Sequence, residues 1–220
     1  MADLINHQSQ SQTSFQIDPA GQLFVMKNEG RTTFRKGKEI FLDYGGDHSI
    51  FSTFMRYGMV QEDDPLGYLP IHVGDSQFEM TLRVSGPKVM WFFRSLIEEH
   101  EGVEPGARQR ATDLRSMQLC THLLRQYLLE KPSRLSSDMA EYKALTGFSR
   151  TKLVMLYRIE LKKILHRNYA FCDRLQMRLL CLGPALDERS LRYSKVLFDA
   201  ETFANSAFHE DISVLDVTER

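Results

Sequence analysis

The sequence predicts an α+β fold in which a β-rich N-terminal part precedes a mainly α-helical part. Two observations indicate this. Up to residue 44, short apolar and β-branched runs alternate with turn sequences that contain proline or glycine. From residue 87 to residue 182, apolar residues recur every three or four positions, which is helical spacing. Strands that come before the helices, instead of alternating with them, are typical of an α+β arrangement.

The β-rich part follows a polar stretch at 8–14, which is expected to be an exposed loop. Short strands are predicted at 15–17, 22–26, 32–34 and 39–44. The first two flank residues 18–21, where a proline followed by a glycine suits a tight turn. A glycine at the centre of 36–38 turns the chain into the last strand, which ends in Tyr44.

Glycines at 45 and 46 end that strand, and the next segment, 49–57, has apolar residues at helical spacing, which predicts a short helix. Residues 63–67 combine two acids, a proline and a glycine, as expected at a domain boundary. Beyond it, apolar and polar residues alternate over 77–84, which predicts a half-buried strand.

Four helices are predicted after that strand. They begin at Pro87, near residue 107, at Asp138 and after Ser149. Glu141, three residues after Asp138, suggests a capping pair for the third helix. The fourth extends to about residue 182, and its length leaves a break at 166–168 as an alternative.

This layout divides the chain into three parts. Residues 1–64 form the β-rich part, residues 65–184 form the helical domain, and residues 185–220 form a C-terminal tail for which no element is predicted.

The composition restricts the class of protein. The formal net charge is −1, so the chain as a whole has no electrostatic reason to bind nucleic acid. Three widely spaced cysteines indicate neither a disulfide framework nor a zinc site, and they fit a reducing compartment. No apolar run is long enough to span a membrane, so we expect a soluble intracellular protein with no metal site.

Three motifs in a fixed order carry a resemblance to a known family. They are the Asn6-His7 pair, the strand that ends in Tyr44, and the segment 56–60, which contains Tyr57. Together they resemble the C-terminal half of the SET domain of protein methyltransferases. The chain over 1–182 is most similar to the Rubisco large-subunit methyltransferase type, in which a helical substrate-binding domain follows the SET domain. Only five residues precede Asn6, so the N-terminal SET strands are expected to be absent from this sequence.

The resemblance implies an S-adenosyl-L-methionine-dependent protein-lysine N-methyltransferase, present here as an incomplete or degenerate copy. It implies that Tyr44 is the catalytic tyrosine, that Asn6 and His7 line the cofactor pocket, and that Tyr57 lines the channel for the substrate lysine. The substrate would be a protein side chain, lysine or less commonly histidine. Three positions depart from the family pattern, namely Ile50, Ser52 and Met59.

Other interpretations of these residues remain open. Tyr44 could pack at a sheet edge, Tyr57 could be a core aromatic, and the Asn6-His7 pair could lie in a solvated loop. A non-catalytic protein-binding module with a vestigial SET remnant is the alternative function. Residues 149–182 contain eight Lys or Arg residues and only two acidic residues. This excess of basic residues favours a solvated helix face over a docking surface for an acidic protein. Nucleic-acid binding is the weakest interpretation, because no RNA-binding motif accompanies these charges.

Overall fold

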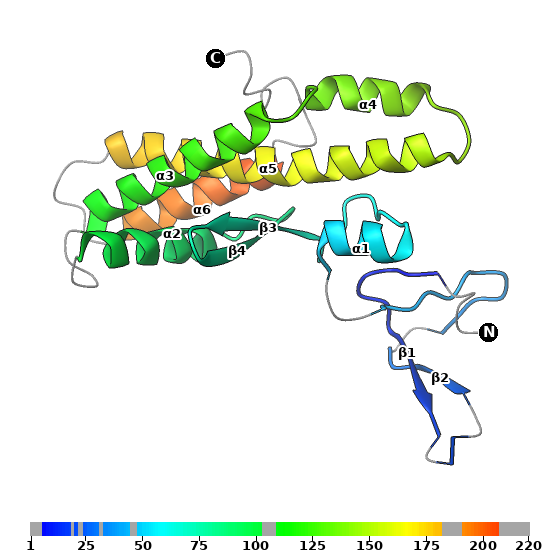
Figure 1. Ribbon diagram of the computed structural model, residues 1–220. Helices are drawn as coiled ribbons and strands as arrows, with labels where there is room; N and C mark the ends of the chain where they lie inside the picture. The colour runs from blue at the N-terminus through cyan, green and yellow to red at the C-terminus, as the bar shows by residue number, and fades with distance from the viewer. Residues whose placement is uncertain are drawn as a thin grey trace.

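The computed structural model describes residues 6–18, 20–21, 24–30, 33–44, 48–102, 109–181 and 191–206. It is an α+β structure with two small antiparallel sheets, as the sequence predicts at this level. Figure 1 shows an elongated helical body with a hairpin lying against it and the N-terminal segments at one end. None of the described helices is both long enough and apolar enough to cross a bilayer.

The first sheet is a hairpin of β1 (Thr13–Ile17) and β2 (Phe24–Asn28). Phe15 pairs with Met26 in its antiparallel register. The two strands predicted on either side of the turn are therefore confirmed; β1 begins two residues earlier and β2 ends two residues later than predicted, and the predicted start of β2 at residue 22 lies outside the described residues.

The strand predicted over 39–44 is wrong. Among the described residues of this segment, only Leu42 is in a β-bridge, a parallel one with His7. Leu42 N donates to the carbonyl of Asn6 (3.0 Å), and Leu42 O accepts from Gln8 N (3.0 Å). A strand needs a neighbouring strand that pairs with it along its length, and here the neighbouring segment pairs with a single residue, Leu42. Residues 33 and 34 of the predicted third β region are not in a strand either.

Helix α1 (Ile50–Tyr57) confirms the helix predicted over 49–57. Its N-cap is Ser49, whose Oγ accepts a hydrogen bond from Ser52 N. It ends at Gly58, which has a φ of 62°, a left-handed conformation that glycine adopts without steric cost.

The second sheet is a hairpin of β3 (Tyr68–Val73) and β4 (Ser76–Thr81), joined by a two-residue turn. The sequence predicted only β4, and it placed the end of the strand three residues too late. β3 contains Pro70, which argues against a central strand. Proline is accommodated here because β3 has only one partner strand and Pro70 lies where no ladder N–H is required.

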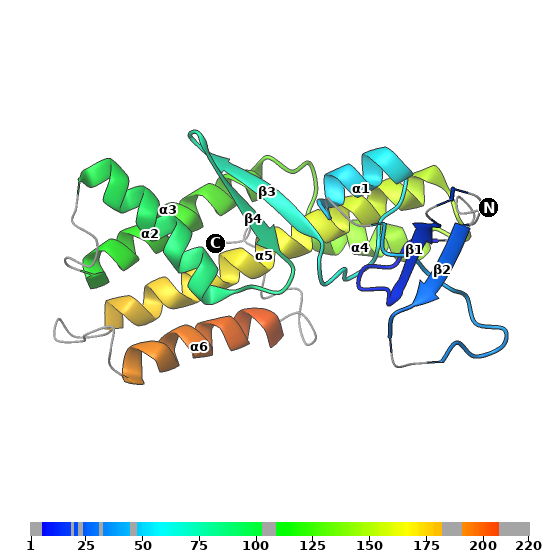
Figure 2. The same ribbon diagram turned by 90° about the horizontal axis from the view of Figure 1, so that it is seen from below.

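The helical body consists of α2 (Gly86–Glu101), α3 (Gln109–Leu129), α4 (Leu135–Ala144), α5 (Arg150–Cys181) and α6 (Leu191–Ser206). Figure 2 shows α5 running through the middle, with α3 and α6 beside it. α5 is one continuous helix of 32 residues, so the alternative of a break at 166–168 is wrong. Ser149 caps it as predicted, accepting from Lys152 N (3.1 Å). α6 lies in the region for which the sequence predicted no element.

One apolar core joins α2, α3, α5, α6 and the second hairpin. Phe93, Leu124 and Phe171 are fully buried in it. Among the described residues, this core cluster contains none that precedes Ile50. The N-terminal segments therefore lie outside the main core.

Two polar predictions fail in this body. Asp138 is not a helix cap, because α4 begins three residues before it and its side chain is buried against α5. The basic residues of α5 do not form a uniformly solvated face, since the side chains of Lys162 and Lys163 are 2% and 6% exposed. Both lysines instead form buried ion pairs, with Asp138 and with Glu160 respectively.

Candidate functional site

The motifs separated in sequence meet at the end of the molecule where the N-terminal segments lie. The bridge between His7 and Leu42 places the first motif beside the chain that leads to Tyr44. Tyr44 N donates a hydrogen bond to His7 Nδ1 (3.1 Å), which fixes the two residues relative to each other.

Three of the four sequence-predicted site residues have their rings in contact. The ring centroids of His7 and Tyr44 are 5.1 Å apart, and those of Tyr44 and Tyr57 are 5.0 Å apart in an edge-on arrangement. Tyr44 thus lies between His7 and Tyr57 and is half-buried, whereas Tyr57 is 47% exposed.

Asn6 is brought to the same segment by its backbone, but its side chain points elsewhere. The side-chain amide of Asn6 is exposed and donates to the carboxylate of Glu39. The structure therefore gathers His7, Tyr44 and Tyr57 through their rings and leaves the Asn6 amide at the surface beside them.

A chain of hydrogen bonds holds His7 in one orientation. Because its Nδ1 accepts from Tyr44 N, the proton of the neutral ring lies on Nε2. Nε2 then donates to Ser9 Oγ (3.2 Å), and Ser9 Oγ donates to Asp64 Oδ2 (2.9 Å). The Ser9 backbone N–H also donates to Gln61 (3.0 Å). Ser9 is 5% exposed, so the exposed loop predicted over 8–14 is wrong at this position.

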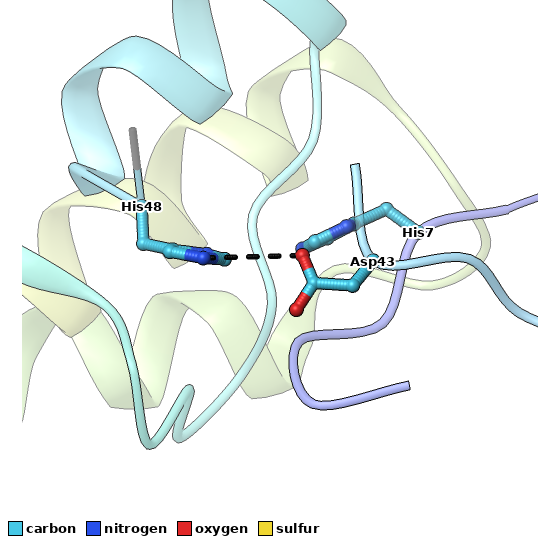
Figure 3. A group of neighbouring side chains, drawn as sticks. All are labelled: His7, Asp43 and His48. Atoms are coloured by element: carbon cyan, nitrogen blue, oxygen red, sulfur yellow. Dashed lines mark ion pairs between the residues drawn. The ribbon is translucent and has the colours of Figure 1, made fainter. Parts of the chain in front are cut away.

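Asp43 and His48 complete the neighbourhood, although neither was predicted from the sequence as a site residue. Figure 3 shows His48 facing Asp43, with His7 beside them. His48 Nε2 lies 3.9 Å from Asp43 Oδ1, and Gln10 N donates to the other carboxylate oxygen (3.1 Å). The position of Asp43 immediately before Tyr44 was the one sequence signal that could have indicated it.

His7, Asp43 and His48 present potential metal-ligand atoms within 4.8 Å of one another. Two imidazoles and a carboxylate are ligands that zinc and iron accept. However, both nitrogens of His7 are already engaged, Nδ1 by Tyr44 N and Nε2 by Ser9 Oγ. Metal binding through His7 would break one of these bonds. The arrangement is better suited to holding the backbone at Tyr44 in place than to binding an ion.

The three residues that depart from the SET pattern lie in α1 or just after it. Ile50 is 9% exposed and belongs to the main core. Ser52 N donates to the N-cap, and Met59 is half-buried after the helix. Ile50 therefore contributes packing where the family pattern would place a polar contact.

Comparison with known proteins does not assign the chain to a family. No family model matches it, and no curated protein is significantly similar to it.

Proposed function

We propose that this chain is the C-terminal part of a SET-type protein methyltransferase that binds S-adenosyl-L-methionine and modifies a lysine side chain of a protein. The observation that carries the proposal is the contact of Tyr44 with both His7 and Tyr57. These residues come from three motifs up to fifty positions apart. If the three motifs form one site, their residues must lie close together in the folded chain, as these three rings do.

The residues of the first motif fit the cofactor. Leu42 bonds to Asn6 O and Gln8 N, so the N–H and C=O of His7 point away from that bridge. A backbone donor and acceptor pair of this kind suits the edge of an adenine ring. The exposed amide of Asn6 can both donate and accept, as the amino-acid end of the cofactor requires.

The bound cofactor would supply an electrophilic methyl group. The task of the protein is then to align the acceptor nitrogen with that methyl group and to exclude water. The Tyr44 hydroxyl can orient the amine by hydrogen bonding, and the ring of Tyr57 can pack against the aliphatic stem of a lysine. The bond from Tyr44 N to His7 fixes the backbone that carries the catalytic hydroxyl.

Calorimetry with S-adenosyl-L-methionine tests the cofactor site. We expect saturable binding that Asn6→Ala abolishes and that Asn28→Ala, on β2, leaves unchanged. In a chain extended by N-terminal SET strands, Tyr44→Phe should abolish methyl transfer and retain cofactor binding. Tyr142→Phe, on α4, is the matched control. Methyl transfer by the Tyr44→Phe protein would place the reactive centre elsewhere.

A non-catalytic protein-binding module is the second candidate. It is favoured by the main core, which among the described residues begins at Ile50 and so does not need the N-terminal segments. An absence of binding heat at millimolar cofactor, in a chain whose helical body is folded, would support this candidate over the first.

A further inference from the structure

A cavity of about 810 Å³ lies between β4 and the first turns of α2. Its strand side is lined by Gln77, Phe78 and Glu79. Its helix side is lined by Lys88, Trp91 and Phe92. We call this cavity the β4 groove. It is separate from the contacts of Tyr44 described above.

The β4 groove runs along an unpaired strand edge. The two-residue turn makes Val73 and Ser76 a hydrogen-bonded pair, and such pairs then alternate along the ladder. The N–H and C=O groups of Gln77 and Glu79 consequently point away from β3. No described strand pairs with β4 on that side, so this backbone is available to an added strand.

Two hydrogen bonds at the open end of the hairpin support this register. Asn168 Nδ2 donates to Thr81 O (3.0 Å), and Tyr68 N donates to His48 O (3.3 Å). Thr81 and Tyr68 are paired with each other, and both use their backbone groups outside the ladder. Gln77 and Glu79 have the same parity as Thr81 in β4, so their backbone groups face the same way.

Aromatic side chains flank this edge. Phe78 and Phe92 stack with centroids 4.8 Å apart and form an apolar floor. Trp91 lies on the rim and is 71% exposed. Tryptophan is enriched among the residues that dominate binding energy at interfaces, and its exposure in the unbound chain leaves a large apolar area to bury.

Charge narrows the class of partner. Arg83 and Lys88 line the groove and are exposed, whereas Glu79 is the one acidic residue among its described lining residues. The groove therefore has a net positive charge. An unpaired strand edge selects an extended polypeptide, and the basic side chains select acidic residues within it.

We infer that the β4 groove binds an extended segment of a partner protein, in which acidic residues alternate with apolar ones, as a strand added to β4. Backbone hydrogen bonds to Gln77 and Glu79 hold the segment. Its apolar side chains pack on Phe92 and Trp91. This binding requires neither the cofactor nor Tyr44, so it stands independently of the methyltransferase proposal.

The test uses the full chain and a short synthetic peptide in which glutamate alternates with valine and phenylalanine. Fluorescence polarisation measures binding without S-adenosyl-L-methionine. Trp91→Ala should weaken binding about tenfold or more, as expected for an anchor residue. Phe148→Ala, which removes an aromatic that is 87% exposed elsewhere, should not change it. Lys88→Glu should weaken binding, and Lys143→Glu, on α4, is the charge control.

Two further measurements isolate the strand edge. On peptide binding, the amides of Gln77 and Glu79 should become protected from hydrogen exchange. A peptide N-methylated at alternate amides should not bind, because it cannot pair with β4. Equal binding of the methylated peptide, or no protection of these amides, overturns the inference. Self-association that Trp91→Ala abolishes, with no peptide binding, would identify a second copy of the chain as the occupant and would also overturn it.

Discussion

Lys162 Nζ on α5 lies 2.5 Å from Asp138 Oδ2 on α4, and the two side chains are 2% and 1% exposed. Lys162 also donates to the carbonyl of Ser133 (2.6 Å), and Arg158 donates to the other oxygen of Asp138 (2.9 Å). α4 is therefore held on α5 by a charge cluster in which Lys162 and Asp138 are buried and Arg158 is partly exposed. Because Lys162 and Asp138 have been removed from water, each tolerates the loss of its partner poorly.

Replacement of Asp138 by alanine should destabilise the protein by about 3–5 kcal/mol, the typical cost of leaving a buried charge without its partner. Lys162 would keep its hydrogen bonds to Ser133 but lose the carboxylate of Asp138. Urea unfolding followed by circular dichroism measures the effect. Glu141→Ala, at an exposed position of the same helix, is the control and should change stability by less than about 0.5 kcal/mol. Equal effects of the two substitutions would contradict the buried-pair interpretation.

Glu160 should make a recognisable contribution to the pH dependence of stability. Burial raises the pKa of Glu160 above its ordinary value near 4.5, although Lys163 and the backbone N–H of Asp63 bond to its carboxylate. At pH values between the ordinary and the raised pKa, the Glu160 carboxyl keeps its proton in the folded chain but has released it in the unfolded chain. The free energy of unfolding contributed by Glu160 therefore falls as pH rises through this interval.

Glu160→Gln should remove that contribution. We expect the stability of the wild-type chain, relative to the variant, to decrease as pH rises upward from about 4.5, when urea unfolding is measured across this interval. Glu141→Gln is the exposed control and should follow the wild-type curve. A parallel pair of curves for wild type and Glu160→Gln would show that burial does not govern this carboxylate.

The cysteines should differ strongly in reactivity. Cys120 and Cys172 are buried between α3 and α5 with their sulfur atoms 2.8 Å apart, and Cys181 is exposed. Burial raises the pKa of Cys120, so less of it is present as the reactive thiolate. An aromatic disulfide reagent should modify Cys181 rapidly and the other two about 100-fold more slowly or not at all before unfolding. Cys181→Ser should abolish the rapid phase, and a rapid phase that persists would contradict the packing of α3 on α5.

The sequence predicted correctly those features that depend on contacts between residues close together in the chain. Ser149 was recognised as a helix N-cap because the bond it accepts comes from Lys152 N, only three residues away. Asp138 was misread because its partner Lys162 is 24 residues distant. The strand over 39–44 failed for the same reason, since a sequence pattern does not reveal whether a neighbouring strand exists.

The residues of the candidate site also divide into those that the sequence predicted and those that it did not. The order of the motifs singled out His7, Tyr44 and Tyr57, whose rings lie in contact. Ser9 and Asp43 were missed, because they act through bonds to residues 55 and 33 positions away. Such partners are determined by the folded chain and leave no periodic signal in the sequence.

The last prediction concerns the difference in local stability between the N-terminal hairpin and α5. In β1, Phe15 and Ile17 are 52% and 64% exposed, and an isolated two-stranded hairpin is at best marginally stable in water. The residues of α5 between Ile164 and Leu175 are mostly buried in the main core. Amides of β1 and β2 should therefore exchange with solvent at least about 1,000-fold faster than amides in the middle of α5.

Native-state hydrogen exchange measures this difference in local stability. Repeating the measurement with the cofactor tests whether the N-terminal segment forms a binding site. If S-adenosyl-L-methionine binds through Asn6 and His7, it should slow exchange in the segment from 6 to 44 and leave α5 unchanged, because ligand binding stabilises the segment that forms the site. Asn6→Ala should abolish that protection. Slow exchange of β1 and β2 without any ligand would mean that the N-terminal segments are stabilised by contacts beyond those of the hairpin, and it would remove the structural argument for an independent helical module.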